Sequence, residues 1–281
     1  MKFGTIGGRL VLVRGQTAVD AYQASGGTWA ADPLSVLARW PEFCGWADDP
    51  GAVDWERGLP LSDAMLGPPV PHPRQVFAVA LNYRPHAEEG GYQPPSDPLI
   101  FTKFPACISG PVTEVTLPPG KVDWEVELVV VVGTGGYQIS RERAWTAVAG
   151  LTVGQDLSER ALQMRGVPPQ FSLAKSFPGF GPTGPVAVTA SELPDRDDLA
   201  LACALDGEVV QSDRTSQMIF SVSDLVAYIS AACPLLPGDL IFTGTPAGVG
   251  NRRTPPRYLQ PGQELVSRID GIGEIRQRFA G

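Results

Sequence analysis

The chain has 281 residues, 43% of them hydrophobic and 19% charged, which excludes a mostly disordered protein and provides ample core material. Its 22 Lys and Arg against 30 Asp and Glu leave a formal net charge of −8, so we expect neither nucleic acid nor an anionic membrane surface as a partner. The 32 Gly and 28 Pro are spread along the chain, which favours many short strands joined by tight turns over a helical bundle.

The first 66 residues differ in composition and pattern from the rest. They hold four of the six tryptophans, and they start with the alternating residue pattern that is typical of a hairpin. A helix is predicted over 33–40. The segment 67–73, GPPVPHP, predicts a stiff extended connector, since proline restricts both itself and the residue before it. We therefore predict a small N-terminal α/β domain over 1–67 and a larger domain over 68–281.

Short strands dominate the larger domain, and the predicted ones span 77–81, 99–103, 125–132, 151–155 and 264–269. A helix is predicted over 142–149. Asp206-Gly207 between two alternating runs predicts a hairpin, and Ser221 with Asp224 three residues later predicts a capping box for a helix that ends at 232. The pattern is typical of a β-rich α+β protein, a mixed β-sandwich roll, and not of a doubly wound sheet.

The sequence offers no signal for a membrane or an oxidising compartment. The longest apolar run, 128–132, is far shorter than the roughly 20 residues that cross a bilayer, and Gly and Arg interrupt the N-terminus where a signal-peptide core would lie. The four cysteines lie far apart without a CxxC pair, so we interpret them as free thiols. We expect a cytoplasmic protein.

The segment VDWEVELVVVVG places Asp123, Glu125 and Glu127 at alternate positions of a predicted strand, and therefore on one face. Like charges side by side are unfavourable unless a cation binds between them, and a hard divalent cation takes oxygen ligands. Replacing Glu125 by Gln is therefore expected to stabilise the metal-free protein. On spacing alone, an acidic edge strand that faces solvent is the favoured interpretation.

A second acidic feature shifts that balance toward a site. Asp156 closes an apolar predicted strand, and Arg160 and Gln163 follow at spacings that share one helical face. A carboxylate, a guanidinium and an amide that converge at a strand end suit an anionic oxygenated ligand. The alternative is an ordinary helix start with a surface ion pair.

Only two histidines occur in the chain, and His86 is followed three residues later by Glu89 and then by two glycines. In a helical turn the two side chains share a face, so Glu89 could orient His86 as a general base on a mobile lid. A solvated His beside acidic residues is an equally good interpretation of this spacing alone.

Two glycine-rich stretches suit ligand loops. Lys175 precedes a run of Gly and Pro turns, and Thr245 lies in FTGTPAGVG, whose backbone N–H groups could hold a carboxylate. The alternative is that glycine and proline only form the corners of a β-roll.

Taken together, these segments resemble the fumarylacetoacetate hydrolase family, in its bacterial type with a small N-terminal domain. Over residues 70–281, six motifs occur in the order found in that family: NYRPHAEE, DWEVEL, TVGQDLSERALQ, LAKSFPGFGPTGP, LDGEVVQ and PGDLIFTGTPAGVG. The resemblance implies one divalent ion, Mg²⁺ or Mn²⁺, held by Glu125, Glu127 and Asp156. It implies that the catalytic residues are His86, Glu89 and Lys175.

The resemblance also implies a homodimer, and substrate-binding roles for Arg160, Gln163 and Thr245. We add Lys103, at the end of the predicted strand 99–103, to the substrate-binding candidates. The substrate implied is a small 2-oxo or 2,4-dioxo acid.

These roles predict a metal-dependent hydrolase that cleaves a carbon–carbon bond of an acylpyruvate through a metal-bound pyruvate enolate. His86, aided by Glu89, would activate the water that attacks the 4-carbonyl. Oxaloacetate decarboxylation, and isomerisation or hydration of an unsaturated 2-oxo acid, share the enolate and stay open. A non-catalytic module that binds a metal or a 2-oxo acid is disfavoured, because His86, Glu89 and Lys175 are all present.

Overall fold

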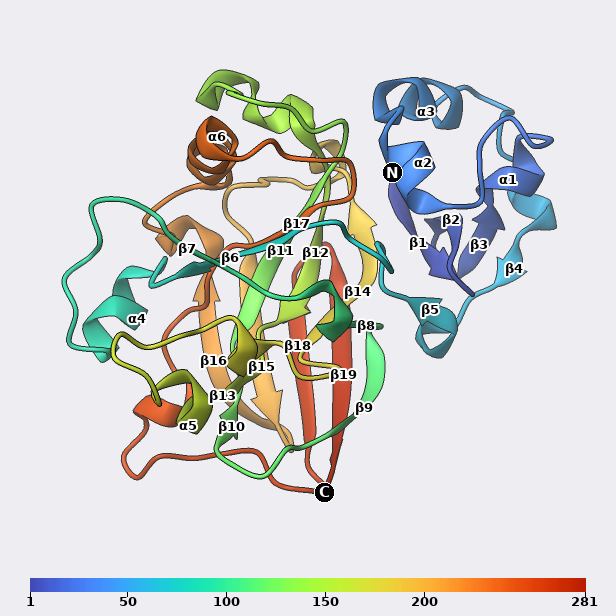
Figure 1. Cartoon of the computed structure of the whole chain (residues 1–281). Coiled ribbons are helices and arrows are strands. Elements are labelled where there is room, and N and C mark those ends of the chain that lie inside the picture. The colour runs from blue at the N-terminus through green and yellow to red at the C-terminus, as the bar shows by residue number, and fades with distance from the viewer.

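The computed structural model describes residues 1–281, apart from the side chain of Ala64. Strands predominate and helices are short, as Figure 1 shows, which confirms the β-rich α+β class. The strands are β1 (Lys2–Ile6), β2 (Arg9–Arg14), β3 (Thr17–Asp20), β4 (Leu59–Pro60), β5 (Leu66–Gly67), β6 (Val76–Ala80), β7 (Leu99–Thr102), β8 (Ile108–Ser109), β9 (Val112–Thr116), β10 (Val122–Asp123), β11 (Val126–Val132), β12 (Val148–Gln155), β13 (Ser158–Glu159), β14 (Gly181–Val188), β15 (Ala200–Leu205), β16 (Glu208–Arg214), β17 (Leu240–Phe242), β18 (Glu264–Ile269) and β19 (Gly273–Ala280).

The α-helices are α1 (Ala21–Ala24), α2 (Pro33–Leu37), α3 (Trp40–Ala47), α4 (Arg84–Glu89), α5 (Arg160–Gln163) and α6 (Val222–Ala232). The 3₁₀ turns are η1 (Trp55–Arg57), η2 (Asp63–Met65), η3 (Pro105–Cys107), η4 (Arg141–Ala147), η5 (Leu173–Lys175), η6 (Ala190–Glu192), η7 (Thr215–Gln217) and η8 (Gly250–Arg252).

Two mixed sheets form the body of the protein. The larger has the order β4-β3-β2-β1-β14-β12-β11-β17-β6-β7, with β5 beside β1 and β8 beside β14. The smaller has the order β16-β15-β18-β19-β9 and packs on the larger one, with β18 against β12 and β19 against β14. A short ladder of β10 and β13 stands apart from both sheets and carries part of the site.

The N-terminal segment continues the large sheet. Strand β1 pairs antiparallel with β14, with Lys2 opposite Val188, and the segment forms the blue lobe beside the body in Figure 1. Its aromatic side chains pack on the outer face of the sheet, where the rings of Trp40 and Phe43 stack at 5.5 Å. The division into domains 1–67 and 68–281 stays a prediction.

Strand β11 explains the unbroken apolar run of the sequence. Val126, Leu128 and Val130 point into the core between the sheets, while Val129 and Val131 point into the second cluster beneath the N-terminal segment. Since β11 lies between β12 and β17, with every residue buried, the interpretation as an acidic edge strand is wrong.

Several local predictions are confirmed. Asp206 and Gly207, both with positive φ (51° and 85°), join β15 to β16, as a two-residue hairpin turn requires. Ser221 and Asp224 form the capping box of α6. The free thiols are confirmed for all four cysteines, and the described chain contains no helix of the length and apolarity that a bilayer crossing needs.

Two predicted helices are wrong in extent. The segment 142–149 forms the 3₁₀ turn η4 and then enters β12 at Val148, because pairing of Val148 with Val132 outweighs local helix propensity. The helix predicted over 33–40 ends at Leu37, and α3 starts at Trp40 with Pro41 in its first turn, where a missing N–H is tolerated.

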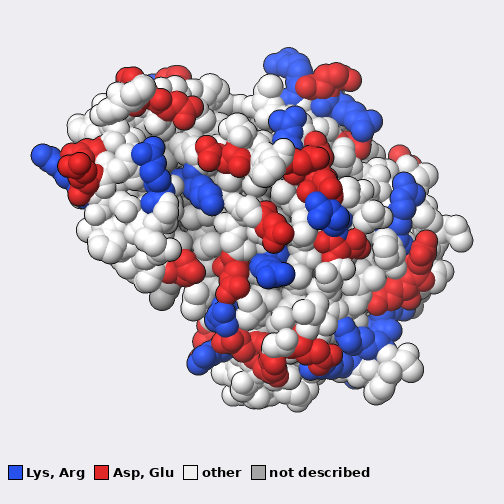
Figure 2. Space-filling model, turned by 180° about the vertical axis from the view of Figure 1, so that it is seen from behind, with Lys and Arg blue, Asp and Glu red and all other residues white. Residues whose placement is uncertain are grey.

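On the face shown in Figure 2, acidic and basic side chains are interspersed.

Candidate active site

Three buried carboxylates meet at one end of strands β11 and β12. Glu125 immediately precedes β11, Glu127 lies within it, and Asp156 directly follows β12. The antiparallel register, with Val126 opposite Gln155, brings these positions together. One oxygen from each carboxylate lies within 4.8 Å of the others.

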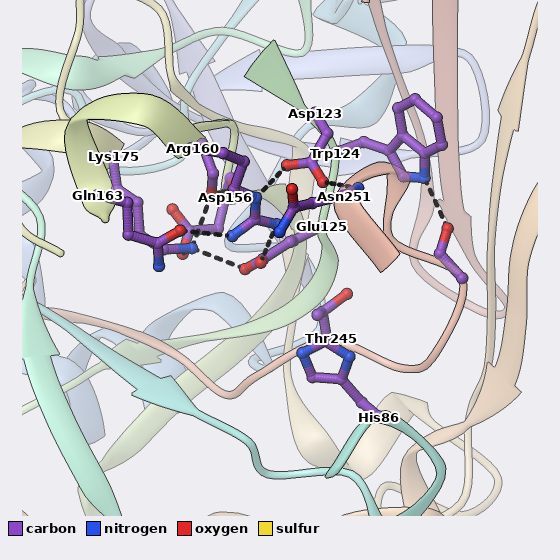
Figure 3. Close-up of polar contacts among 12 residues, drawn as sticks. His86, Asp123, Trp124, Glu125, Asp156, Arg160, Gln163, Lys175, Thr245 and Asn251 are labelled. Atoms are coloured by element: carbon purple, nitrogen blue, oxygen red, sulfur yellow. Dashed lines mark hydrogen bonds and ion pairs between the residues drawn. The ribbon is translucent and has the colours of Figure 1, made fainter. Parts of the chain in front are cut away.

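Two cations hold Glu125 in place (Figure 3). Lys175 Nζ lies 2.7 Å from Glu125 Oε2 and 2.6 Å from Asp156 Oδ2, and it also donates to Ser158 Oγ at 2.8 Å. Arg160 Nη2 donates to Glu125 Oε1 at 2.6 Å. Burial opposes ionisation of Glu125, but Lys175 and Arg160 outweigh it and lower the pKa of this carboxyl to about 2. Burial likewise opposes charging of Lys175, yet Asp156 and Glu125 raise its pKa.

Glu127 lacks such compensation. It accepts a hydrogen bond from the backbone N–H of Gly244 at 2.8 Å, and within the part of the chain that the structure describes no ion pair reaches it. Burial, reinforced by the charges of Asp156 and Glu125, holds the pKa of Glu127 well above its usual range. Replacing Glu125 would relieve its repulsion of Glu127 but would also remove the pairs with Arg160 and Lys175, so the stabilisation expected from the sequence does not fit this geometry.

The donor set fits a hard divalent cation. Carboxylate oxygens are the ligands that Mg²⁺ and Mn²⁺ prefer, and a bound cation would favour the ionised form of Glu127, which burial and the neighbouring carboxylates disfavour in the metal-free protein. The residues that would hold it are the predicted ones, Glu125, Glu127 and Asp156.

Lys103 lies beneath this cluster. Its Nζ donates to Asp156 Oδ1 at 2.6 Å, to the Phe180 carbonyl at 3.1 Å and to the Lys175 carbonyl. Its side chain is fully buried, so the amine has no access to a substrate. The substrate-binding role predicted for Lys103 does not fit this geometry, and holding Asp156 does.

Helix α5 presents Arg160 and Gln163 to the site. Glu159 caps its N-terminus by accepting hydrogen bonds from Ala161 and Leu162. Arg160 Nε donates to Asp123 Oδ1 at 2.6 Å, and Nη1 donates to Gln163 Oε1 at 2.9 Å. The second bond turns the amide so that the Gln163 NH₂ group is the part free to donate.

The predicted His–Glu pair forms on α4. His86 Nδ1 lies 3.1 Å from Glu89 Oε2, and Pro85 occupies the first turn of the helix. The other oxygen of Glu89 accepts a hydrogen bond from the backbone N–H of Gly248 at 3.0 Å. The pair is therefore fixed to the glycine-rich turn across the site, and the His86 ring points toward Thr245 in Figure 3.

The turn that carries Thr245 is tied to β11. Thr245 Oγ1 donates to the Val126 carbonyl at 2.9 Å and accepts from Gln211 Nε2 at 2.8 Å. Gly244 in this turn has φ +97°, a left-handed conformation that favours glycine. A Cβ there would lie 2.7 Å from Cβ of Asn82.

A cavity of about 510 Å³ opens above these groups. Six predicted residues line it: His86, Glu125, Arg160, Gln163, Lys175 and Thr245. Of the described residues that were predicted for the site, four do not line the cavity: Glu89, Lys103, Glu127 and Asp156.

Ser158 and the ion-pair role of Asp123 were not predicted from the sequence. Ser158 accepts from Lys175, and Asp123 receives both Arg160 and the backbone N–H of Asn251 at 2.7 Å. The alternation that grouped Asp123 with Glu125 was the available signal. The apolar part of the cavity wall was also missed, because Tyr92 and Phe171 lie in segments without a periodic pattern.

Comparison with known proteins agrees with the geometry. Residues 75–280 match the family described as Fumarylacetoacetate (FAA) hydrolase C-terminal. The chain is 44% identical over 219 residues to the human mitochondrial oxaloacetate tautomerase FAHD2A. The aligned region covers 77% of this chain and 70% of that protein.

Solved structures extend the likeness to the whole chain. A Mycobacterium smegmatis protein provisionally described as HpcE is 52% identical with a TM-score of 0.94, covering 100% of this chain and 99% of that one. The fumarylpyruvate hydrolase of Pseudomonas aeruginosa, solved with Mn²⁺ and pyruvate, is 34% identical with a TM-score of 0.68, covering 74% of this chain and 90% of that one.

Proposed function

Because this chain belongs to the fumarylacetoacetate hydrolase family, we propose that it is a metal-dependent enzyme that hydrolyses the C3–C4 bond of an acylpyruvate. The observation that carries the proposal is one cavity lined both by the His86 base and by the carboxylate end at Glu125. Hydrolysis needs both, since one end must activate water while the other holds a 2-oxo acid.

Glu125, Glu127 and Asp156 would hold one Mg²⁺ or Mn²⁺, which when bound supplies a Lewis acid for the 2-oxo and carboxylate oxygens. The Gln163 amide, oriented by Arg160, would donate to the same acid group. The turn at Thr245 would orient that group from the opposite side, because its hydroxyl is fixed by Val126 and Gln211.

His86 would remove a proton from a water molecule as that water attacks the 4-carbonyl. Glu89, at 3.1 Å from Nδ1, fixes the tautomer that leaves Nε2 as the base and stabilises the imidazolium that forms. The C3–C4 bond then breaks, its electron pair stays on C3 as the pyruvate enolate, and the acyl carbon leaves as a carboxylic acid. Lys175, on the cavity wall beside Glu125, would balance the enolate charge.

Oxaloacetate tautomerisation is the second candidate, and the 44% identity to the human tautomerase favours it. That reaction shares the enol but consumes no water, so it would use His86 or Lys175 only to move a proton. Decarboxylation of oxaloacetate, and isomerisation or hydration of an unsaturated 2-oxo acid, remain further alternatives on the same site.

The test is a substrate panel with the purified protein and Mg²⁺ or Mn²⁺. Loss of enol absorbance with formation of pyruvate and a second acid, and ¹⁸O from labelled water in that acid, are expected for acylpyruvates. Conversion of enol- to keto-oxaloacetate without any acylpyruvate cleavage would replace the hydrolase by the tautomerase. The homodimer stays a prediction. The cytoplasmic location also stays a prediction, since the human relative is named as mitochondrial.

A further inference from the structure

The cavity has two chemically different ends. The charged groups gather at the catalytic end, where Arg160 and Lys175 are paired with Glu125. The rest of the wall is largely apolar and comes from the chain after α4, from β7 and from the segment that follows α5. The side chains that form this apolar wall are Tyr92, Pro98, Leu99, Phe101, Met164 and Phe171.

Side chains of the apolar wall contact one another and also face the open cavity. The rings of Phe101 and Phe171 meet edge to face at 5.4 Å between centroids. Leu99, Tyr92 and Met164 remain 47%, 50% and 59% exposed. Large apolar side chains gathered at the mouth of a cavity are a feature of ligand-binding surfaces.

The wall begins beside the catalytic lysine. Lys175 Nζ lies 5.3 Å from the centre of the Phe101 ring, so a group joined to the reacting carbons passes directly from the charged end onto this surface. The cavity volume of about 510 Å³ lies within the roughly 300–1,000 Å³ of pockets that enclose drug-sized ligands. A pyruvate unit with a small acyl group would leave the apolar wall in contact with water.

We propose that the apolar wall binds a bulky hydrophobic acyl group, an aromatic ring or a branched alkyl chain, on C4 of the 2,4-dioxo acid. The inference rests on the proposed function, because it assigns the group that departs as the carboxylic acid. Burial of that group against the wall contributes binding energy in proportion to the apolar area removed from water.

The competing assignment is a substrate with a second carboxylate, and Arg252 is the residue that would bind that carboxylate. It lines the cavity, and among the described residues no ion pair reaches it. Its guanidinium is exposed and lies 5.8 Å from the centre of the Tyr92 ring. A carboxylate held there in water would gain little, whereas the apolar wall is continuous from Lys175 outward.

The experiment compares three substrates of the full chain with Mn²⁺: benzoylpyruvate, acetylpyruvate and fumarylpyruvate. We expect kcat/KM for benzoylpyruvate to exceed that for acetylpyruvate by about tenfold or more. Leu99→Ala and Phe171→Ala are expected to lower kcat/KM for benzoylpyruvate about tenfold while changing that for acetylpyruvate about twofold or less. Leu173→Ala is the matched control, since Leu173 is 64% exposed and outside the cavity lining.

Binding separates this inference from the proposed function. In His86→Ala turnover is expected to be about 10²- to 10⁴-fold slower, so calorimetry with this variant measures affinity for the same acids. Tighter binding of benzoylpyruvate that Phe171→Ala weakens supports the wall even if no acylpyruvate is cleaved. Absence of cleavage for every acylpyruvate would overturn only the hydrolase. A preference for acetylpyruvate, or for fumarylpyruvate with loss of that preference in Arg252→Gln, would overturn the apolar wall.

Discussion

Glu89 joins the helix of the proposed base to the glycine-rich turn, because its Oε1 accepts the backbone N–H of Gly248 at 3.0 Å. The same carboxylate meets His86 Nδ1 at 3.1 Å through its other oxygen. The orientation of the imidazole therefore depends on the backbone path at Gly248. Glycine is required there, since φ is +105° and a Cβ would lie 2.2 Å from the Val210 carbonyl oxygen.

Gly248→Ala should disturb the turn and the base together. The left-handed φ alone costs about 1–2 kcal/mol for an alanine, and the contact with Val210 adds to it, so turnover is expected to fall about 10²-fold through misplacement of His86. Gly262→Ala is the matched control, with φ +88° and open space for a Cβ. Urea unfolding and steady-state kinetics measure both variants. Equal turnover in the two would show that the Gly248 contact does not position His86.

Removing the base should separate chemistry from binding. His86→Ala is expected to lose about 10²- to 10⁴-fold in kcat, the range that general-base catalysis supplies, with metal affinity unchanged. Glu89→Gln should lose less, because an amide still accepts from Gly248 but no longer stabilises the imidazolium. Kinetics with acylpyruvates and calorimetric Mn²⁺ titration measure the two effects. Hydrolysis by His86→Ala at nearly the wild-type rate would exclude His86 as the base.

The two glutamates of the carboxylate cluster should respond oppositely in metal-free protein. Glu125→Gln breaks buried pairs with Lys175 and Arg160, so a loss of about 3 kcal/mol in unfolding free energy is expected. Glu127→Gln removes a buried carboxyl whose ionisation no cation in the described chain compensates, and should leave stability unchanged or higher. Both should weaken Mg²⁺ and Mn²⁺ binding. Unfolding in chelator and calorimetry measure these effects, and unchanged metal affinity in Glu127→Gln would remove Glu127 as a ligand.

Much of the carboxylate site could be predicted from spacing, because a strand fixes alternate residues on one face. Glu125 and Glu127 follow this rule directly, and Asp156 was found because a charge is unusual at the end of an apolar strand. The pairing of each carboxylate with a cationic side chain in the metal-free protein could not be predicted in this way. Which glutamate is paired depends on where Lys175 and Arg160 reach across from η5 and α5, and this is set by tertiary packing.

The fold class could be predicted from turn residues and strand patterns, whereas the place of individual strands could not. The run at 126–132 is apolar on both faces, and only its pairing with β12 and β17 shows that it is central. Lys103 shows the same limit for a side chain. Its position at a strand end suggested a ligand-facing lysine, while three oxygen acceptors in the fold draw its amine beneath the site.

Lys175 should act as a charge and not as a nucleophile, because its Nζ donates to three oxygens and has no free lone pair. Lys175→Met is expected to lower turnover strongly even at saturating Mn²⁺, and borohydride with substrate should trap nothing. Lys103→Met is the comparison, since it also loses a buried pair with Asp156 but lies behind the cavity. Saturating Mn²⁺ should restore part of its turnover. A covalent adduct at Lys175 in mass spectrometry would contradict the enolate mechanism.

Asp239 should make folding stability depend on pH. It accepts hydrogen bonds from Gln75 N at 3.0 Å, Gln75 Nε2 at 2.7 Å and Leu236 N at 2.7 Å, but burial outweighs these and raises its pKa to about 6. An unfolded Asp has a pKa of about 3.9, so the folded state binds more protons between these values. The contribution of Asp239 to stability is therefore fully present below about pH 4 and is lost as the pH rises to about 6.

Asp239→Asn cannot titrate, so the stability of the wild type relative to this variant should fall as the pH rises from about 4 to about 6. Urea unfolding in chelator at several pH values measures the difference. Asp198→Asn is the control of opposite sign, because a hydrogen bond from Arg214 lowers the pKa of the partly exposed Asp198. The wild type should therefore gain stability over that variant as the pH rises to about 4 and should keep most of that gain unchanged up to about pH 6. A difference between wild type and Asp239→Asn that stays constant across this range would show that folding does not raise the pKa of Asp239.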